Sequence, residues 1–175
     1  MLNFNLTNQM YEKLVWSGAD MSPERLENCW NWHSKIIKFG RMNCALVVEE
    51  ESRYAILLMN LKKQDFKHFH KCFLIELHDH FNELFFNSDK QVKNKLKSFI
   101  DGLCGSCSFS KPISRSVSAH MTQMDYEINI FCHREFGGYL PSSQFEMMSM
   151  YQFLNNCPRS LGKKFGYHNP IEKFR

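Results

Sequence analysis

The chain has 175 residues, of which 43% are hydrophobic and 16 are phenylalanine. This composition predicts one globular domain over residues 1–175 and argues against disorder. The net charge of +4 is too small for a protein that binds nucleic acid by charge alone. No stretch approaches the ~20 apolar residues that cross a bilayer. No signal-peptide pattern opens the chain. We therefore expect a cytoplasmic protein without membrane contacts, whose seven cysteines stay reduced.

The first sixty residues predict mainly strands. "LNFNL" (residues 2–6) alternates apolar and polar side chains, which predicts a short strand half-buried on one face. A helix capped by Thr7 or Asn8 follows, and Ser22 before Pro23 indicates the start of another. Residues 30–61 hold three runs rich in β-branched and aromatic residues with short polar breaks between them. They predict an antiparallel meander whose second run, 44–48, is covered on both faces.

From residue 62 the apolar spacing changes to three and four residues, which predicts helices. The first is one long amphipathic helix reaching Leu84, and Ser88 is expected to cap the second. Ser114 is expected to cap a third that ends at Gly137, and Ser143 to begin a fourth that stops before Pro158. The order of elements predicts an α+β fold: a small, mainly antiparallel sheet with helices packed on one side.

The cysteines raise the question of a metal site. Cys104 and Cys107 form a C-x-x-C, and Cys132 with His133 could complete a set of zinc ligands. Adjacent residues on a helix point about 100° apart and seldom share a metal. We therefore expect no metal and no cofactor, with the cysteines acting as small buried hydrophobes.

A serine and a histidine stand four residues apart in the third helix. Ser116 and His120 could hydrogen-bond on one helical face and act as nucleophile and base. Asp125, the nearest acid, does not share that face cleanly, so the reading of an enzyme is the weaker one.

Basic and aromatic residues are mixed at the end of the chain. Aromatic rings can stack on bases while cations meet phosphates, which predicts contact with nucleic acid or a partner. The alternative is that the rings pack into the core and the cations stay in water. The candidate binding residues are Arg159, Lys163, Lys164, Tyr167, Lys173 and Arg175.

Three ordered stretches, 31–66, 113–128 and 153–170, together resemble a bacterial family of small proteins that carry a domain of unknown function. The shared pattern is a Trp-led meander, a helix opening like N-R-S-V-L-G-S-M-N-D, and a late L-N-x-x-P. This chain departs from it at Gln123, where the family pattern has Asp. The family has no established activity, so the resemblance implies a fold and no reaction. The matching residues are Trp32, Asn60, Arg115, Ser116, Val117, Met121, Asn155, Pro158, Tyr167 and Pro170.

Four of the matching residues are interpreted as structural polar contacts: Trp32, Arg115, Ser116 and Asn155. Arg115 at a helix start opposes the helix dipole, so a partner for its guanidinium is expected. Asn155 is expected to close the end of its own helix through its amide. These side chains would brace the scaffold, since buried polar groups need partners whatever their function.

The function expected from this reading is that of a non-catalytic interaction module. The more specific hypothesis is an inhibitor carried on a mobile element, of the anti-CRISPR kind, that binds a host defence or nucleic-acid-processing complex. The alternatives are nucleic-acid binding through the basic end, and an enzyme using zinc or Ser116 and His120.

Overall fold

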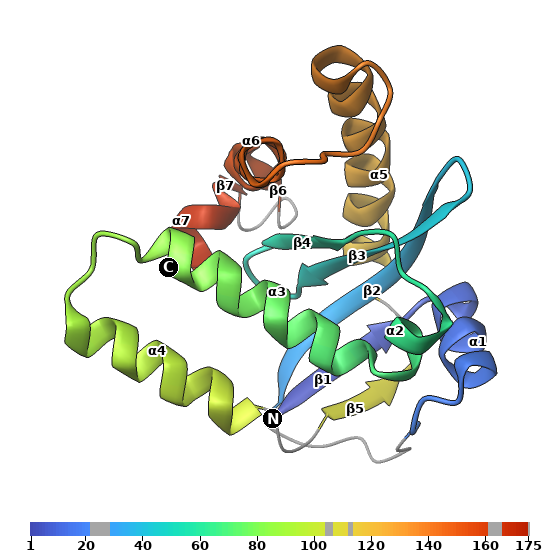
Figure 1. Ribbon diagram of the computed structural model, residues 1–175, viewed down its shortest axis with the longest axis horizontal. Coiled ribbons are helices and arrows are strands. Elements are labelled where there is room, and N and C mark those ends of the chain that lie inside the picture. Colours follow the sequence, from blue (N-terminus) through green and yellow to red (C-terminus); the bar gives the residue numbers. More distant parts are fainter. Residues whose placement is uncertain (22–28, 104–106, 112–113, 161–165, 175) are drawn as a thin grey trace.

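The computed structural model describes residues 1–21, 29–103, 107–111, 114–160 and 166–174 (Figure 1). In chain order the elements are β1 (Leu2–Leu6), α1 (Asn8–Ser17), β2 (Trp30–Phe39), β3 (Met42–Glu49), β4 (Ala55–Leu58), α2 (Lys63–Lys67), α3 (Phe69–Leu84), α4 (Lys90–Leu103), β5 (Cys107–Ser110), α5 (Arg115–Phe136), α6 (Gln144–Asn156), β6 (Arg159–Ser160), β7 (Tyr167–His168) and α7 (Pro170–Phe174). The α+β class is therefore confirmed.

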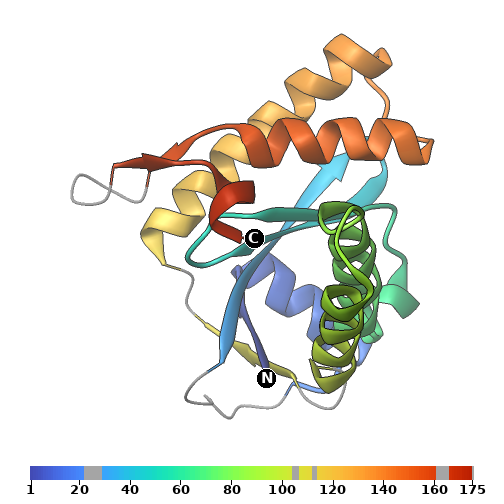
Figure 2. The same cartoon turned by 90° about the vertical axis from the view of Figure 1, so that its left-hand side faces the viewer.

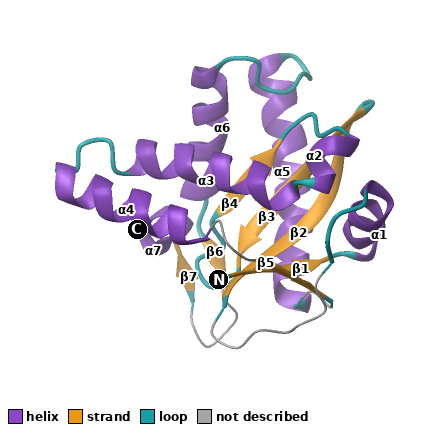
Figure 3. Cartoon of the chain, turned by 60° about the horizontal axis from the view of Figure 1, so that its bottom comes forward, coloured by secondary structure: helices purple, strands orange, loops and turns teal. Residues whose placement is uncertain are grey.

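The central sheet has the strand order β4-β3-β2-β1-β5 (Figure 3). β2, β3 and β4 form the predicted antiparallel meander. β1 instead runs parallel to both β2 and β5, so the sheet is mixed and only its meander half is antiparallel. β5 was not predicted, because four residues with the pattern C-S-F-S carry little strand signal.

β5 is held beside β1 by side chains as well as by backbone pairing. Ser108 Oγ donates to Asn3 Oδ1 at 2.8 Å, and Ser110 Oγ donates to Asn5 Oδ1 at 2.7 Å. Asn3 also donates to Asn31 on β2 at 2.8 Å. The polar positions of "LNFNL" therefore form a hydrogen-bonded ladder across the parallel half of the sheet.

Helices cover both faces of the sheet, so the prediction that they pack on one side is wrong. Figure 2 shows α3 and α4 on one side of the strands and α5 on the other. The reason lies in the strand period, since alternate side chains of β2 enter different cores. Trp32 and Ile36 belong to the core under α1–α4, whereas Ile37 and Phe39 belong to the core under α5 and α6. The second run of the meander, β3, is buried on both faces as predicted.

Some helices begin and end where the sequence predicted, and others do not. Thr7 caps α1 and Ser143 caps α6, where Glu146 completes a capping box. The long helix predicted from residue 62 is divided at His68 into α2 and α3. α4 is capped by Asp89, which accepts from Val92 N at 2.9 Å, and not by Ser88. The start expected at Ser22 and Pro23 lies outside the described residues.

The open edge of the sheet is closed by α6. β4 is an edge strand, so its outward-facing backbone groups lack a neighbouring strand. The Asn155 side chain meets this need at Ala55: Oδ1 accepts from the Ala55 N–H at 2.7 Å and Nδ2 donates to the Ala55 carbonyl at 2.9 Å. One turn earlier, Tyr151 donates its hydroxyl to the Leu57 carbonyl at 3.1 Å. Asn155 therefore acts as a substitute strand residue and does not cap its own helix as predicted.

None of the described helices is long and apolar enough to cross a membrane.

The closure of the β4 edge predicts a large cost for losing Asn155. Asn155→Ala leaves the buried N–H and carbonyl of Ala55 without partners, which should lower the free energy of unfolding by about 3 kcal/mol. Urea unfolding of both proteins measures it. The neighbouring Asn156 is exposed, so Asn156→Ala is a matched control that should change stability by less than about 0.5 kcal/mol. Equal effects of the two substitutions would contradict the role given to Asn155.

Candidate functional site

A buried arginine links the β3–β4 loop to the start of α5. Arg53 is 6% exposed and has a left-handed backbone, with φ of 64°. Its guanidinium donates to the Glu50 carbonyl and, at 3.3 Å, to the hydroxyl of Ser116. A non-glycine residue seldom adopts this backbone, so the surrounding contacts must hold it there.

The same loop is shaped by a buried carboxylate. Glu49 Oε2 accepts from the backbone N–H of Ser52 at 2.6 Å, from its hydroxyl at 2.6 Å, and from Glu51 N–H at 3.0 Å. Charge-assisted bonds of this kind are strong in a buried setting. They fix the turn that carries Arg53, and their favourable free energy offsets the cost of its left-handed backbone.

Ser116 and His120, the weak candidates for a catalytic pair, do not bond through the Ser116 hydroxyl. His120 Nδ1 donates to the backbone carbonyl of Ser116 at 3.0 Å, and not to the Ser116 hydroxyl. That hydroxyl instead accepts from Arg53, a contact that does not make it a better nucleophile. Burial, followed by the charge of Arg53, lowers the pKa of His120. Ser116 is exposed, and its hydroxyl contacts Arg53 while its carbonyl contacts His120.

Arg115 does not have the bracing role that was predicted for it. Its side chain is exposed and makes no hydrogen bond or ion pair with any residue that the structure describes. Ser114 stands at the N-cap position, but its hydroxyl makes no capping bond. Two other charged side chains tie α5 to the sheet: Arg53, which donates to Ser116, and Lys35 on β2, whose ammonium lies 2.8 Å from Asp125 Oδ2.

His33 is a further member of this region that sequence reasoning missed. It is 2% exposed, neither ring nitrogen has a hydrogen-bond partner in the part of the chain that the structure describes, and Nε2 lies 3.7 Å from Glu50 Oε1. Burial and then the charge of Arg53 lower its pKa from 6.5 to about 4. His33 is therefore neutral near pH 7.

Trp32 lies in the core, but not as the polar contact that was predicted. Its ring is fully buried and packs edge-on against Trp30 and Phe73, with centroids 5.0 and 4.8 Å away. Its indole N–H has no hydrogen-bond partner among the described residues. Trp32 therefore serves the core as an apolar ring and not as a polar contact.

The C-terminal cations are divided between the interior and the surface. Arg159 is 2% exposed: it makes two bonds to the Glu127 carboxylate, at 2.9 and 2.6 Å, and one to the Leu154 carbonyl. Its predicted role in binding a partner or nucleic acid is therefore wrong, because its donors join the end of α6 to α5. Lys173 is exposed, but its ammonium donates to the Glu51 carbonyl. Tyr167 is 79% exposed, whereas Lys163, Lys164 and Arg175 lie outside the described residues.

The weak metal candidates are not brought together. Cys107 packs against the core under α1–α4, Cys132 is buried in the core under α5 and α6, and His133 is exposed. Burial raises the pKa of both thiols to about 11, which disfavours the thiolate that binds metal. Cys104 lies outside the described residues, and the described residues contain no cluster of metal ligands.

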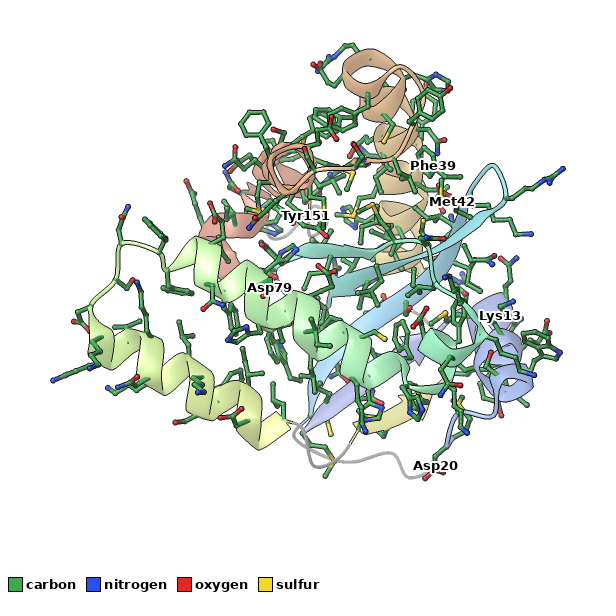
Figure 4. All side chains as sticks on the ribbon, viewed as in Figure 1. Lys13, Asp20, Phe39, Met42, Asp79 and Tyr151 are labelled. Atoms are coloured by element: carbon green, nitrogen blue, oxygen red, sulfur yellow. The ribbon has the colours of Figure 1, made fainter. Side chains whose placement is uncertain are left out.

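An apolar hollow lies where the β2–β3 hairpin meets the loop between α5 and α6. It has a volume of about 530 Å³. Figure 4 labels Met42 at the β2–β3 hairpin. Met42 is 36% exposed, and Tyr139 is 75% exposed. Exposed methionine and aromatic side chains around a hollow are typical of surfaces that bind proteins. We call this hollow the corner surface; it is lined by Met42, Met59, Asn60, Phe136, Tyr139, Leu140, Pro141, Ser142 and Glu146.

Taken together, the structure is a mixed sheet between two helical layers. Its buried charged side chains bond to other groups of the chain, and an apolar hollow lies at one corner. The chain belongs to the family described as Domain of unknown function (DUF6933), which matches residues 3–173. The predicted resemblance to an uncharacterised domain family is thereby confirmed. No curated protein and no solved structure matches the chain.

The neutral state of His33 predicts a loss of stability in acid. The unfolded chain takes up a proton near pH 6.5 and the folded chain only near pH 4. Stability should therefore fall as the pH drops through this window, by about 3 kcal/mol in total from His33. Urea unfolding at pH 7 and at pH 4.5 measures this loss. Between these two pH values, the free energy of unfolding should fall by about 2 kcal/mol less in the His33→Gln protein than in the unsubstituted chain.

His78 is the matched control for this experiment, because its side chain is 44% exposed. His78→Gln should leave the loss of stability in acid unchanged. An equal loss in the His33→Gln protein and the unsubstituted chain would show that His33 does not contribute.

Proposed function

We propose that this chain is a non-catalytic interaction module that binds a partner protein through the corner surface. The observation that supports this most is the exposure of Tyr139 beside an apolar hollow of about 530 Å³. Tyrosine is among the residues that contribute most to binding when a partner buries them. The hollow is large enough to receive an apolar side chain from the other protein.

The internal use of the polar side chains also favours binding over catalysis. Arg53 and Arg159, which are the buried arginines among the described residues, donate to groups of the chain itself. Ser116 and His120 are directed to different partners. A partner would therefore meet mainly aromatic and apolar groups with a polar rim, as in most protein interfaces.

The finer proposal concerns the kind of partner. A small module that covers part of another protein can block it without any chemistry. We propose that the partner is a host defence or nucleic-acid-processing complex and that this chain inhibits it. The ground for this part is that small members of uncharacterised bacterial families often travel on phages and plasmids.

A second candidate function is nucleic-acid binding at the C-terminal end, and Tyr167 is the observation that favours it. This ring stands on β7 with 79% of its surface exposed, and it is free to stack on a base. Arg159 no longer supports this alternative, because its charge is buried against Glu127.

One pair of substitutions distinguishes the two surfaces. The tagged chain is purified from its source cells, and the proteins and nucleic acids that it retains are quantified. Tyr139→Ala should reduce the capture of a stoichiometric protein partner by about tenfold, because an exposed anchor ring is lost without a change in the core. Tyr167→Ala, equally exposed on another surface, should leave that capture unchanged.

Three outcomes would contradict the proposal. The first is the absence of any stoichiometric protein partner, and the second is capture that Tyr139→Ala does not weaken. The third is loss with Tyr167→Ala alone, together with retained nucleic acid that is released by salt, which would support the second candidate.

A further inference from the structure

The lysines of α4 form a basic surface that the proposed function does not use. Residues 90–97 contain four lysines and no acid, although the whole chain has a net charge of +4. Figures 1 and 2 show α4 as the outermost helix of its layer, and it packs against α3. A large part of the positive charge is therefore concentrated where a partner can reach it.

Three of these lysines share one outward side of the helix. Ile100, on the opposite side, is buried in the core under α1–α4, whereas Lys90, Lys93 and Lys97 are exposed. Residues spaced by three and four lie one turn apart on the same side of a helix. At 1.5 Å per residue they form a row about 10 Å long. We call Lys90, Lys93 and Lys97 the lysine row.

No carboxylate of the described residues neutralises the lysine row. None lies within ion-pair distance of its three ammonium groups, and this includes Asp101, one turn after Lys97. Asp89, which precedes the row, accepts from the backbone at the start of the helix. Like charges one turn apart repel each other, so an anion that bridges them is favoured.

An exposed aromatic ring stands beside the lysine row. Phe86, in the turn between α3 and α4, is 68% exposed. Lys93 Nζ donates to the Phe86 carbonyl at 2.7 Å and lies 5.4 Å from the centre of its ring. An ammonium group has three donors, so Lys93 keeps two for another acceptor. The ring and the cation are thus held next to each other in the free protein.

We propose that the lysine row and Phe86 bind single-stranded nucleic acid. Phosphates of the strand would accept from the three ammonium groups, while a base stacks on the Phe86 ring. Lysines one helical turn apart are about 5 Å apart along the axis, so a flexible strand can bring a phosphate to each.

The ring decides between nucleic acid and an acidic protein. A single strand supplies a row of anions together with flat rings whose faces are free. Acidic side chains of a protein would pair with the lysines and leave Phe86 in water. The lysine row is on a different helix from the corner surface, so the inference does not depend on the protein partner proposed above.

The test uses the purified full chain and a fluorescent oligothymidylate of about 15 nucleotides. Fluorescence anisotropy gives its Kd between about 50 and 200 mM salt. The logarithm of Kd should rise with that of the salt concentration with a slope of about 2, since each lysine that meets a phosphate of a single strand contributes about 0.7. Replacing Lys90, Lys93 and Lys97 together by glutamine should weaken binding more than tenfold at the lower salt concentration and remove most of this slope.

A matched variant removes the same charge elsewhere. Lys38, Lys67 and Lys71 are also exposed, and replacing these three by glutamine should weaken binding less than about threefold. Phe86→Ala should weaken binding about tenfold and leave the salt slope unchanged, because a stacked ring is lost and no cation is.

Four results would overturn the inference. One is the absence of binding at about 50 mM salt, and another is equal weakening in the two triple variants, which would show that only the net charge matters. The third is loss of binding with Tyr167→Ala while the lysine-row variant still binds. The fourth is tighter binding of a DNA duplex or of polyglutamate of similar length, since neither offers a free base to Phe86.

Discussion

The unpaired edge of β4 is the constraint on which the arrangement of the second helical layer depends. An edge strand must find partners for its outward backbone groups, and here α6 supplies them through two side chains one turn apart. Asn155 pairs with both backbone groups of Ala55, and Tyr151 with the carbonyl of Leu57. Because an amide offers one donor and one acceptor side by side, it can replace a strand residue as few other side chains can. This contact fixes the position of α6 relative to the sheet.

The position of α6 in turn shapes the corner surface. Glu146, near the start of the helix, lines this hollow. The other end of the helix is joined to α5 through Arg159, which contacts both Leu154 and Glu127. The buried polar groups are therefore structural, and they leave aromatic and apolar side chains as the features that a partner would meet. That division underlies the proposal of an interaction module.

The sequence predicted what depends on local pattern. The meander followed from its β-branched runs, and the caps at Thr7 and Ser143 followed from side-chain chemistry. It did not predict β5, whose pairing relies on contacts with Asn3 and Asn5 more than a hundred residues away. The two-sided packing was missed because the sequence does not say which helices cover each face of β2, where Ile36 enters one core and Ile37 and Phe39 enter the other. Only the fold decides which core each of these side chains enters.

The candidate site residues were likewise predictable only as far as local sequence patterns reach. Asn155 was recognised as structural, although its partner across the sheet could not be known. Arg159 was assigned to the surface because it belongs to a basic stretch, and only the fold brings Glu127 to it. His33 and Arg53 carried no sequence signal, since an isolated histidine or arginine is not informative until its burial is known. Their environments, and not their spacing, distinguish them.

The most direct test of the closed edge is the hydrogen exchange of the Ala55 amide, measured by NMR in the native state. This N–H donates to Asn155 Oδ1 and to no strand, so its protection reports on the contact with α6 alone. If α6 closes the edge, the Ala55 amide should exchange as slowly as that of Val47 in the interior of the sheet. Exchange at the rate of an unstructured amide, with Val47 still protected, would show that the edge is open.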